Sequence, residues 1–175
     1  QPNLSLILGG AGTSLENLVG AYSALARGGQ AGAPRLTQDD PVISRYMMSP
    51  GAAFIVRDIL ESGGFNGRML EQGAGARRGL AWKTGTSFGF RDAWALGVSD
   101  RFTYGVWVGR PDGAPNPGYF GANVAAPFLV DLFDAFDGQM QPTSRTPPDT
   151  VSQARICWPL GLLEKDLPKD LCHEA

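Results

Sequence analysis

The chain has 175 residues, of which 43% are hydrophobic and 18% charged, and its formal net charge is −2. This length suits one globular domain, or a domain with a short appendage, and this composition excludes disorder along the whole chain. The lack of a basic stripe argues against nucleic acid as a partner, and no apolar run approaches the ~18 residues of a membrane span. With His173 as the single histidine, no multi-histidine metal centre and no cofactor are predicted.

The first predicted helix covers residues 14–27. Thr13 and Glu16 have the spacing of a capping box, and apolar residues then recur at intervals of three and four. Residues 30–46 follow with Gly, Pro, Asp and Thr in no clear period, so we predict mostly loop there.

A second helix is predicted to begin after Ser49, which can cap it, with Pro50 in the first helical position. Two consecutive glycines at 63–64 mark its end, and residues 65–79 read as a surface loop rich in Gly and Arg. The side chains expected to be buried are its large apolar ones: Phe54, Ile55, Val56 and Ile59.

Three antiparallel strands are predicted over residues 80–86, 93–99 and 102–109. The second strand alternates Trp, Leu and Val with Ala and Gly, and the third alternates in the same way. Connections as short as 88–92 and 100–101 join neighbouring antiparallel strands. We therefore predict a three-strand meander whose last strand leaves an edge open to a further partner.

A third helix is predicted over residues 127–136, after a loop rich in proline. Residues 138–150 contain three prolines and read as a linker, and residues 151–175 form a short appendage with both cysteines. Helices packed on an antiparallel sheet make an α+β fold. The residues of the third helix that are expected to face inward are Phe128, Leu129, Leu132, Phe133 and Phe136. The carboxylates expected in solvent are Asp131, Asp134 and Asp137.

One short motif carries chemistry: Lys83, Thr84, Gly85, Thr86 and Ser87. Lys-Thr-Gly is one of three signatures of penicillin-binding proteins and serine β-lactamases. The tripeptide alone is a weak signal, because chance places it in a chain of this length on the order of a few per cent of the time. By itself it could be a strand with an exposed lysine. Its position on a strand that opens an antiparallel hairpin, with an apolar helix after it, favours instead a catalytic motif of the penicillin-binding type.

Five stretches of the chain are similar in sequence to one protein family. They are residues 9–22, 82–94, 105–113, 125–127 and 156–161. Together with the motif they resemble the penicillin-binding protein 1C family, a branch of the bifunctional class A penicillin-binding proteins. The resemblance implies the C-terminal part of a penicillin-binding or β-lactamase-like transpeptidase fold over residues 1–137. It also implies a linker over 138–150 and the start of a C-terminal accessory module over 151–175.

The resemblance implies a role in acyl transfer for each residue of the motif. The Thr86 amide matches the family's oxyanion donor, and Lys83 supplies positive charge that helps to move protons and to hold a substrate carboxylate. Thr84, Thr86 and Ser87 are expected to bind substrate through their hydroxyls. Gly85 has no side chain, so a substrate or a β-lactam can lie close to the strand.

Two other motifs of the family are absent. None of the three lysines follows a serine at the Ser-x-x-Lys spacing of the nucleophile, and none of the ten serines begins a Ser-x-Asn. Because the chain also begins with Gln1 and not Met, we expect it to be a processed or recombinant piece of a longer protein. The upstream part is expected to carry both motifs and a glycosyltransferase domain, as one polypeptide or as a separate chain, so that this chain alone is inactive.

The function implied for the parent is a peptidoglycan D,D-transpeptidase. It would cross-link stem peptides that end in D-Ala-D-Ala through a serine acyl-enzyme, and β-lactams would acylate the same serine. A β-lactamase or D,D-carboxypeptidase of the same fold, which resolves the acyl-enzyme with water, is an alternative, as is a non-catalytic scaffold or binding module. The implied location is the periplasm, with an anchor to the bacterial inner membrane upstream of this chain.

A few further residues have competing interpretations. Cys157 and Cys172 fit a disulfide in the periplasm that the resemblance implies, with free thiols, or a zinc site with His173, as alternatives. Arg91 and Asp92 adjoin the motif and are expected to form an internal ion pair, with a role at the rim of the site as the alternative. Arg77 and Arg78 could bind a substrate carboxylate or a glycan, but a place in a solvated loop also explains them. Three tryptophans could stack on sugars, but a place in the core also explains them: Trp82, Trp94 and Trp107.

Overall fold

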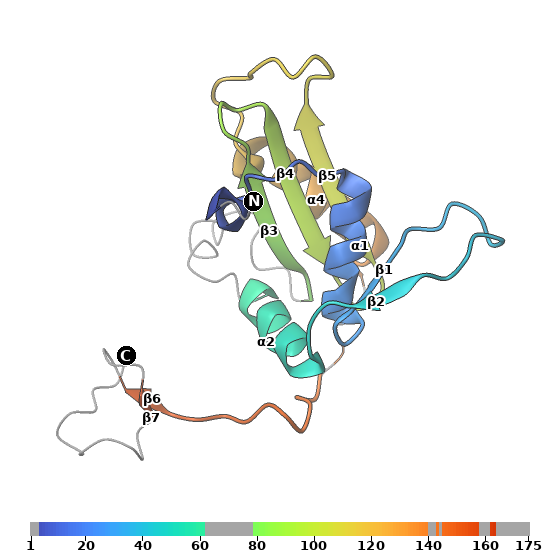
Figure 1. The fold of residues 1–175 in the computed structure, drawn as a ribbon, viewed down its shortest axis with the longest axis vertical. Helices are drawn as coiled ribbons and strands as arrows, with labels where there is room; N and C mark the ends of the chain where they lie inside the picture. The colour runs from blue at the N-terminus through green and yellow to red at the C-terminus, as the bar shows by residue number, and fades with distance from the viewer. Residues whose placement is uncertain (1–3, 62–78, 140–142, 144, 158–161, 164–175) are drawn as a thin grey trace. The chain divides into compact units, whose positions relative to one another are not determined.

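The computed structural model divides the chain into two compact units, Gln1–Arg145 and Thr146–Ala175. The first unit is α+β, as predicted, and is built on a three-stranded antiparallel sheet (Figure 1). No helix within the described part of the chain is long and apolar enough to cross a membrane. The residues that the structure describes are 4–61, 79–139, 143, 145–157 and 162–163.

The sheet is the predicted meander. It consists of β3 (Ala81–Thr86), β4 (Asp92–Val98) and β5 (Thr103–Gly109), paired in the order β3-β4-β5. Both pairs are antiparallel, with Thr86 opposite Ala93 and Asp92 opposite Gly109. Among the described residues β3 and β5 are therefore the two edge strands.

Helices cover both faces of this sheet. In the view of Figure 1, α1 (Leu15–Ala26) lies on the near side, and α4 (Ala126–Phe136) lies behind the strands. We call these sides the front face and the back face. The front face is lined by Lys83, Gly85, Trp94, Leu96, Gly105 and Trp107, and the back face by Thr84, Thr86, Ala93, Ala95, Tyr104 and Val106.

Small residues let the helices approach each face closely. A Cβ added to Gly105 on the front would lie 2.6 Å from Val19 of α1, and one added to Gly97 on the back would lie 3.2 Å from Leu129 of α4. Leu129 joins a buried cluster that includes Leu80 and Tyr104. The alternation of large and small residues read from the sequence therefore places a hydrophobic layer behind the sheet.

The start of α1 differs from the prediction by one residue. The cap is Ser14, whose hydroxyl accepts a hydrogen bond from the Asn17 amide at 3.2 Å. The predicted capping box of Thr13 and Glu16 is therefore wrong, because the cap bonds to the third helical residue and that residue is Asn17. Three residues of α1 are buried: Gly20, Ala24 and Leu25.

Helix α2 (Pro50–Glu61) begins where it was predicted, with the Ser49 hydroxyl accepting from the Ala52 amide at 3.2 Å. Its predicted end at residues 63–64 lies outside the described residues. The predicted burial is wrong for Ile55, Val56 and Ile59, which are 39–52% exposed. The helix instead buries its small face and one cation, which bonds to the Asp100 carboxylate: Gly51, Ala53 and Arg57.

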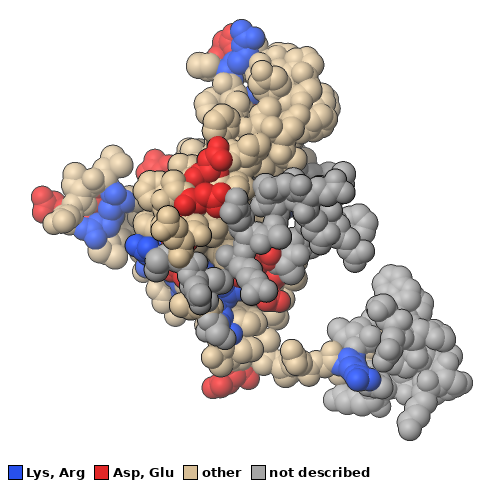
Figure 2. Space-filling view, turned by 180° about the vertical axis from the view of Figure 1, so that it is seen from behind, with Lys and Arg blue, Asp and Glu red and all other residues tan. Residues whose placement is uncertain are grey.

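The inward face of α4 is narrower than predicted. Leu129, Val130 and Phe133 are buried, whereas Phe128 is 58% exposed. The predictions for the other two inward residues, Leu132 and Phe136, are likewise wrong, because a helix packed on a sheet buries only one stripe of its surface. Seen from behind, most of the surface of the described residues carries none of the charged side chains Lys, Arg, Asp and Glu (Figure 2).

One carboxylate of α4's C-terminus is buried. Asp137 is 5% exposed, and its Oδ2 accepts a hydrogen bond from the Tyr104 hydroxyl at 2.6 Å. The prediction that it lies in solvent is therefore wrong, whereas Asp131 is exposed as expected and Asp134 is half-buried. A buried carboxylate needs such a donor, because desolvation without one is unfavourable.

The predicted loop at residues 30–46 contains two short strands. They are β1 (Gln30–Gly32) and β2 (Ser44–Tyr46), paired antiparallel with Gln30 opposite Tyr46. Three residues are too few to show a period in the sequence, so the pairing was missed. It is stabilised from α1, where the Ser23 hydroxyl accepts from the Gly32 amide at 3.2 Å.

The second unit contains a two-stranded antiparallel pair, β6 (Ile156–Cys157) and β7 (Leu162–Leu163). Cys157 is buried and disulfide-bonded. Cys172, the other cysteine of the chain, lies outside the described residues, as does His173, so the pairing stays a prediction.

Candidate functional site

The Lys-Thr-Gly motif lies on edge strand β3, and one backbone hydrogen bond just after the motif shows the direction of its amides. The Ser87 amide donates to the Asp92 carbonyl at 2.9 Å, so these two opposite residues form a hydrogen-bonded pair. Hydrogen-bonded and non-bonded pairs alternate along antiparallel strands. The next pair, Thr86 and Ala93, is therefore a non-hydrogen-bonded pair. In such a pair the Thr86 N–H points away from β4, to the outer edge of the sheet.

The same alternation brings the lysine head to this edge. Thr84 is opposite Ala95, two positions from the Thr86 pair, so its carbonyl also points outward. Lys83 Nζ donates to that carbonyl at 2.6 Å. A positive charge and an outward amide donor therefore lie along one edge, two or three residues apart.

Strand alternation divides the predicted site side chains between the two faces. Lys83 and Gly85 lie on the front face, and Thr84 and Thr86 on the back face. The Thr86 hydroxyl oxygen accepts a hydrogen bond from the Gly121 amide at 3.0 Å. That hydroxyl keeps its own proton for a further acceptor, but its orientation is set from behind the sheet.

Gly85 is exposed and has free space on the front face. A Cβ built there would have one neighbour within 4 Å, the Cβ of Trp94 at 3.8 Å, which is an ordinary contact. The glycine is thus not required by packing within the described part of the chain. Its bare backbone instead leaves room for a molecule lying along the strand.

Ser87 and Asp92 close the turn after the motif. The Ser87 hydroxyl donates to Asp92 Oδ2 at 2.8 Å and accepts from the Asp92 amide at 2.9 Å. Trp107 Nε1 donates to Asp92 Oδ1 at 2.9 Å. The expected ion pair with Arg91 is therefore wrong: the Asp92 carboxylate bonds to Ser87 and Trp107 and fixes the turn at the end of β3.

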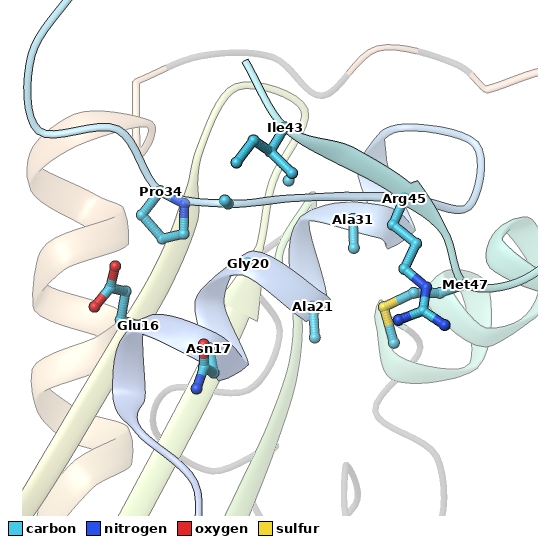
Figure 3. A pocket seen from close by; sticks show the side chains of 11 residues that line it. Glu16, Asn17, Gly20, Ala21, Ala31, Pro34, Ile43, Arg45 and Met47 are labelled. Atoms are coloured by element: carbon cyan, nitrogen blue, oxygen red, sulfur yellow. The ribbon is translucent and has the colours of Figure 1, made fainter. Parts of the chain in front are cut away.

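A separate cavity of about 270 Å³ lies between α1 and the β1–β2 pair. Glu16 and Arg45 stand on opposite sides of it, with the small residues Gly20 and Ala31 between them (Figure 3). None of its lining residues belongs to the 83–87 motif. The described residues contain no group of three side chains able to hold a metal ion.

Comparison with known proteins bears on both units. A family model described as "Penicillin-binding protein 1C linker domain" matches residues 150–175. Penicillin-binding protein 1C of Escherichia coli (strain K12) is 48% identical over 162 residues, which cover 91% of this chain and 21% of that relative. The chain is a homologue of a segment of penicillin-binding protein 1C. The resemblance read from the sequence is therefore confirmed.

Two further similar proteins are also penicillin-binding proteins. Penicillin-binding protein 1A of Clostridium tetani (strain Massachusetts / E88) is 25% identical over 188 residues, covering 95% of this chain and 23% of that protein. The chain thus spans about a fifth of the length of these relatives. A crystal structure of penicillin-binding protein 1A from Haemophilus influenzae superposes with a TM-score of 0.72, at 19% identity, over 91% of this chain and 31% of the other. The chain has the fold of that part.

Sequence reasoning identified residues 83–87 as site residues, but it missed Gly121, which lies behind them. Gly121 bonds to Thr86 from 35 positions away in the sequence. It is one of 24 glycines, and no local pattern marks it. Arg77 and Arg78, also considered from the sequence, lie outside the described residues.

Proposed function

We propose that β3 is one wall of the transpeptidase site of a class A penicillin-binding protein. In this proposal residues 1–137 are the C-terminal part of the transpeptidase domain, 138–150 are a linker and 151–175 begin an accessory module. The Ser-x-x-Lys and Ser-x-Asn motifs come from the rest of the protein. One observation carries the proposal: the outward Thr86 N–H lies beside the bare backbone of Gly85, on an edge strand that also bears Lys83.

This geometry suits acyl transfer from a D-Ala-D-Ala terminus. The serine hydroxyl attacks the carbonyl of the penultimate residue, and the Thr86 N–H stabilises the oxyanion that forms, with the amide of the nucleophile as second donor. The C–N bond breaks, and the terminal D-Ala leaves with a proton. The amine of a neighbouring stem peptide then attacks the ester, forms the cross-link and releases the serine. Lys83 holds the substrate carboxylate and assists proton transfer.

The proposal implies several partners and a location. The substrates are peptidoglycan stem peptides, β-lactams are the inhibitors, and the N-terminal remainder of the same protein supplies the nucleophile. That remainder also carries the glycosyltransferase domain and the inner-membrane anchor, so the site works in the periplasm. Homology to a class A penicillin-binding protein supports each of these assignments.

Penicillin labelling with intact-mass detection tests the function. A longer polypeptide, which contains this chain and the upstream motifs, is expected to gain one penicilloyl adduct on the serine of Ser-x-x-Lys. The 175-residue chain alone is expected to gain none. The variant Gly85→Val is expected to abolish labelling, because its side chain fills the space on the front face, whereas Gly12→Ala, with nothing within 4 Å of its Cβ, is the matched control.

Two results would contradict the proposal. An unlabelled longer polypeptide that is folded would favour the scaffold alternative. Rapid loss of the adduct to water, without transfer to an added amine, would favour the β-lactamase or carboxypeptidase alternative.

A further inference from the structure

We infer that Gly121 is a positioning residue for the oxyanion-binding end of β3. It acts through Thr86, by holding the threonine hydroxyl and by supporting the backbone of Gly85 from the back face. The inference rests on the proposed function for its catalytic consequence, but the contact itself is independent of it.

The first contact is the hydrogen bond from the Gly121 amide to Thr86 Oγ1, at 3.0 Å. Thr86 is the last residue of β3, and its own N–H points outward from the sheet. The Ser87–Asp92 pair holds the backbone on the β4 side, but on its outer side Thr86 has no neighbouring strand among the described residues. The bond from Gly121 fixes the side chain of the one residue whose amide must keep a precise direction.

The second contact is a close approach of backbones. Gly85 and Trp94 form a hydrogen-bonded pair whose side-chain positions both face the front, so their peptide groups are bare on the back. Gly121 lies directly against these groups. A Cβ added to Gly121 would be 2.5 Å from the Gly85 carbonyl oxygen and 2.6 Å from that of Trp94. Only glycine can occupy this place without displacing the strand.

The segment that carries Gly121 is itself held in place. The Asn123 side chain accepts from the Phe120 amide at 2.8 Å and donates to the Gly118 carbonyl at 3.0 Å. The Asn116 amide donates to the Phe90 carbonyl at 2.8 Å, and the rings of Phe90 and Phe120 meet edge to face at 5.1 Å. The loop before η2 (Gly121–Ala125) is therefore tied to the turn between β3 and β4, and it can resist movement of β3.

Acyl transfer is sensitive to such movement. An oxyanion donor must lie within about 3 Å of the developing charge, and a shift of about 1 Å can lower the rate roughly 100-fold. A side chain at position 121 would push at residue 85, directly before the donor. The expected effect is a slower acylation step with little change in the initial binding of the β-lactam, since the front face is unaltered.

Four variants of the longer polypeptide test this. Gly121→Ala and Thr86→Val are each expected to lower the acylation rate constant roughly 10- to 100-fold. Gly121→Ala should also leave the noncovalent dissociation constant within about threefold of wild type. Thr86→Ser, which keeps the hydroxyl, is expected to recover most of the rate lost in Thr86→Val. The double variant Gly121→Ala/Thr86→Val is expected to lose less than the product of the two single losses, because a residue 121 pushed away from Gly85 also loses its hydrogen bond to Thr86. Gly12→Ala is the control.

Amide hydrogen exchange in the 175-residue chain gives a readout that does not depend on activity. Exchange of the Gly121 amide is expected to be at least about tenfold faster in Thr86→Val than in wild type, and to be protected again in Thr86→Ser. This measurement also decides the case in which Gly121→Ala does not fold.

The outcomes separate the two proposals. If the wild-type longer polypeptide does not acylate, the proposed function fails, while the exchange data still decide the contact. If wild type acylates and Gly121→Ala and Thr86→Val match it, the positioning role is wrong. Losses that multiply in the double variant would also overturn it, because the Thr86 hydroxyl would then act on substrate and not through Gly121.

Discussion

Gly85 is part of β3 and Gly121 packs against the back of the same strand, and the two glycines differ in what surrounds their missing side chains. Gly85 faces open space on the front, where an added Cβ would make a single contact at 3.8 Å. Gly121 presses on the same peptide groups from the back, where an added Cβ would clash at 2.5 Å. The absence of a side chain therefore leaves room for a ligand in one case and allows tight packing in the other.

The two faces of β3 follow this division. The back face contacts a buried layer that includes Leu129 and Phe133, whereas the front face at the motif carries the exposed residues Lys83 and Gly85. Substitutions behind the sheet should therefore change stability, whether or not they also change chemistry, and substitutions in front should change chemistry with little effect on stability. Four predictions test that contrast, from the largest expected effect on stability to the smallest.

Removing the centre of the back layer should have the largest effect. Leu129 is fully buried, so Leu129→Ala is expected to lower the free energy of unfolding by about 2–5 kcal/mol through a lost contact and a cavity. Urea unfolding followed by tryptophan fluorescence measures it. Phe128→Ala, at the neighbouring 58% exposed position, is the control and should change the value by about 1 kcal/mol or less. Equal effects would mean that α4 does not pack as described.

The glycine pair is the direct comparison. Gly121→Ala is expected to lower the free energy of unfolding by about 1–3 kcal/mol, because backbone atoms of Gly85 and Trp94 must move. Gly85→Ala should stay within about 0.5 kcal/mol of wild type. The same urea titration measures both. A larger loss at Gly85 than at Gly121 would reverse the assignment of the two faces.

The buried pair behind the sheet predicts a dependence on alkaline pH. Burial, followed by the hydrogen bond to the Asp137 carboxylate and its charge, raises the pKa of the Tyr104 hydroxyl far above the ordinary value of 10.0. A raised folded-state pKa means that stability is complete below pH 10 and falls as the pH rises above it, because the unfolded state then loses the proton first. The chain should therefore lose stability above pH 10.

Tyr104→Phe isolates this contribution. It is expected to lower the free energy of unfolding by about 1–2 kcal/mol at neutral pH, since the buried Asp137 carboxylate loses a donor. It should also flatten the decline above pH 10. Unfolding curves of both proteins between pH 7 and 11 measure the difference, and parallel declines would show that another group titrates.

The smallest effect on stability is expected at the front. Lys83 is exposed, so Lys83→Ala should change the free energy of unfolding by no more than about 0.5 kcal/mol. Under the proposed function the same change should slow penicillin acylation of the longer polypeptide about 100-fold or more. Normal acylation by this variant would remove the lysine from the proposed site.

Much of the architecture follows from short stretches of sequence. The alternation of large and small residues predicted β3, β4 and β5, and Ser49 with Pro50 predicted the start of α2. The burial of the helices was predicted less well. Ile55 and Phe128 have the residue type of a core but are exposed, because a helix buries only the stripe that meets its neighbour. Which stripe that is depends on the whole packing arrangement.

The sequence by itself determined the meander, the three helices and the Lys-Thr-Gly motif, since each rests on neighbours within a few residues. It also determined the homology to penicillin-binding protein 1C, which rests on similarity of sequence. Only the tertiary structure decided that the Thr86 amide points outward, that Asp137 is buried and that Gly121 supports Gly85. These depend on the register between strands and on contacts across more than 30 positions, and local propensity and spacing carry no information about either.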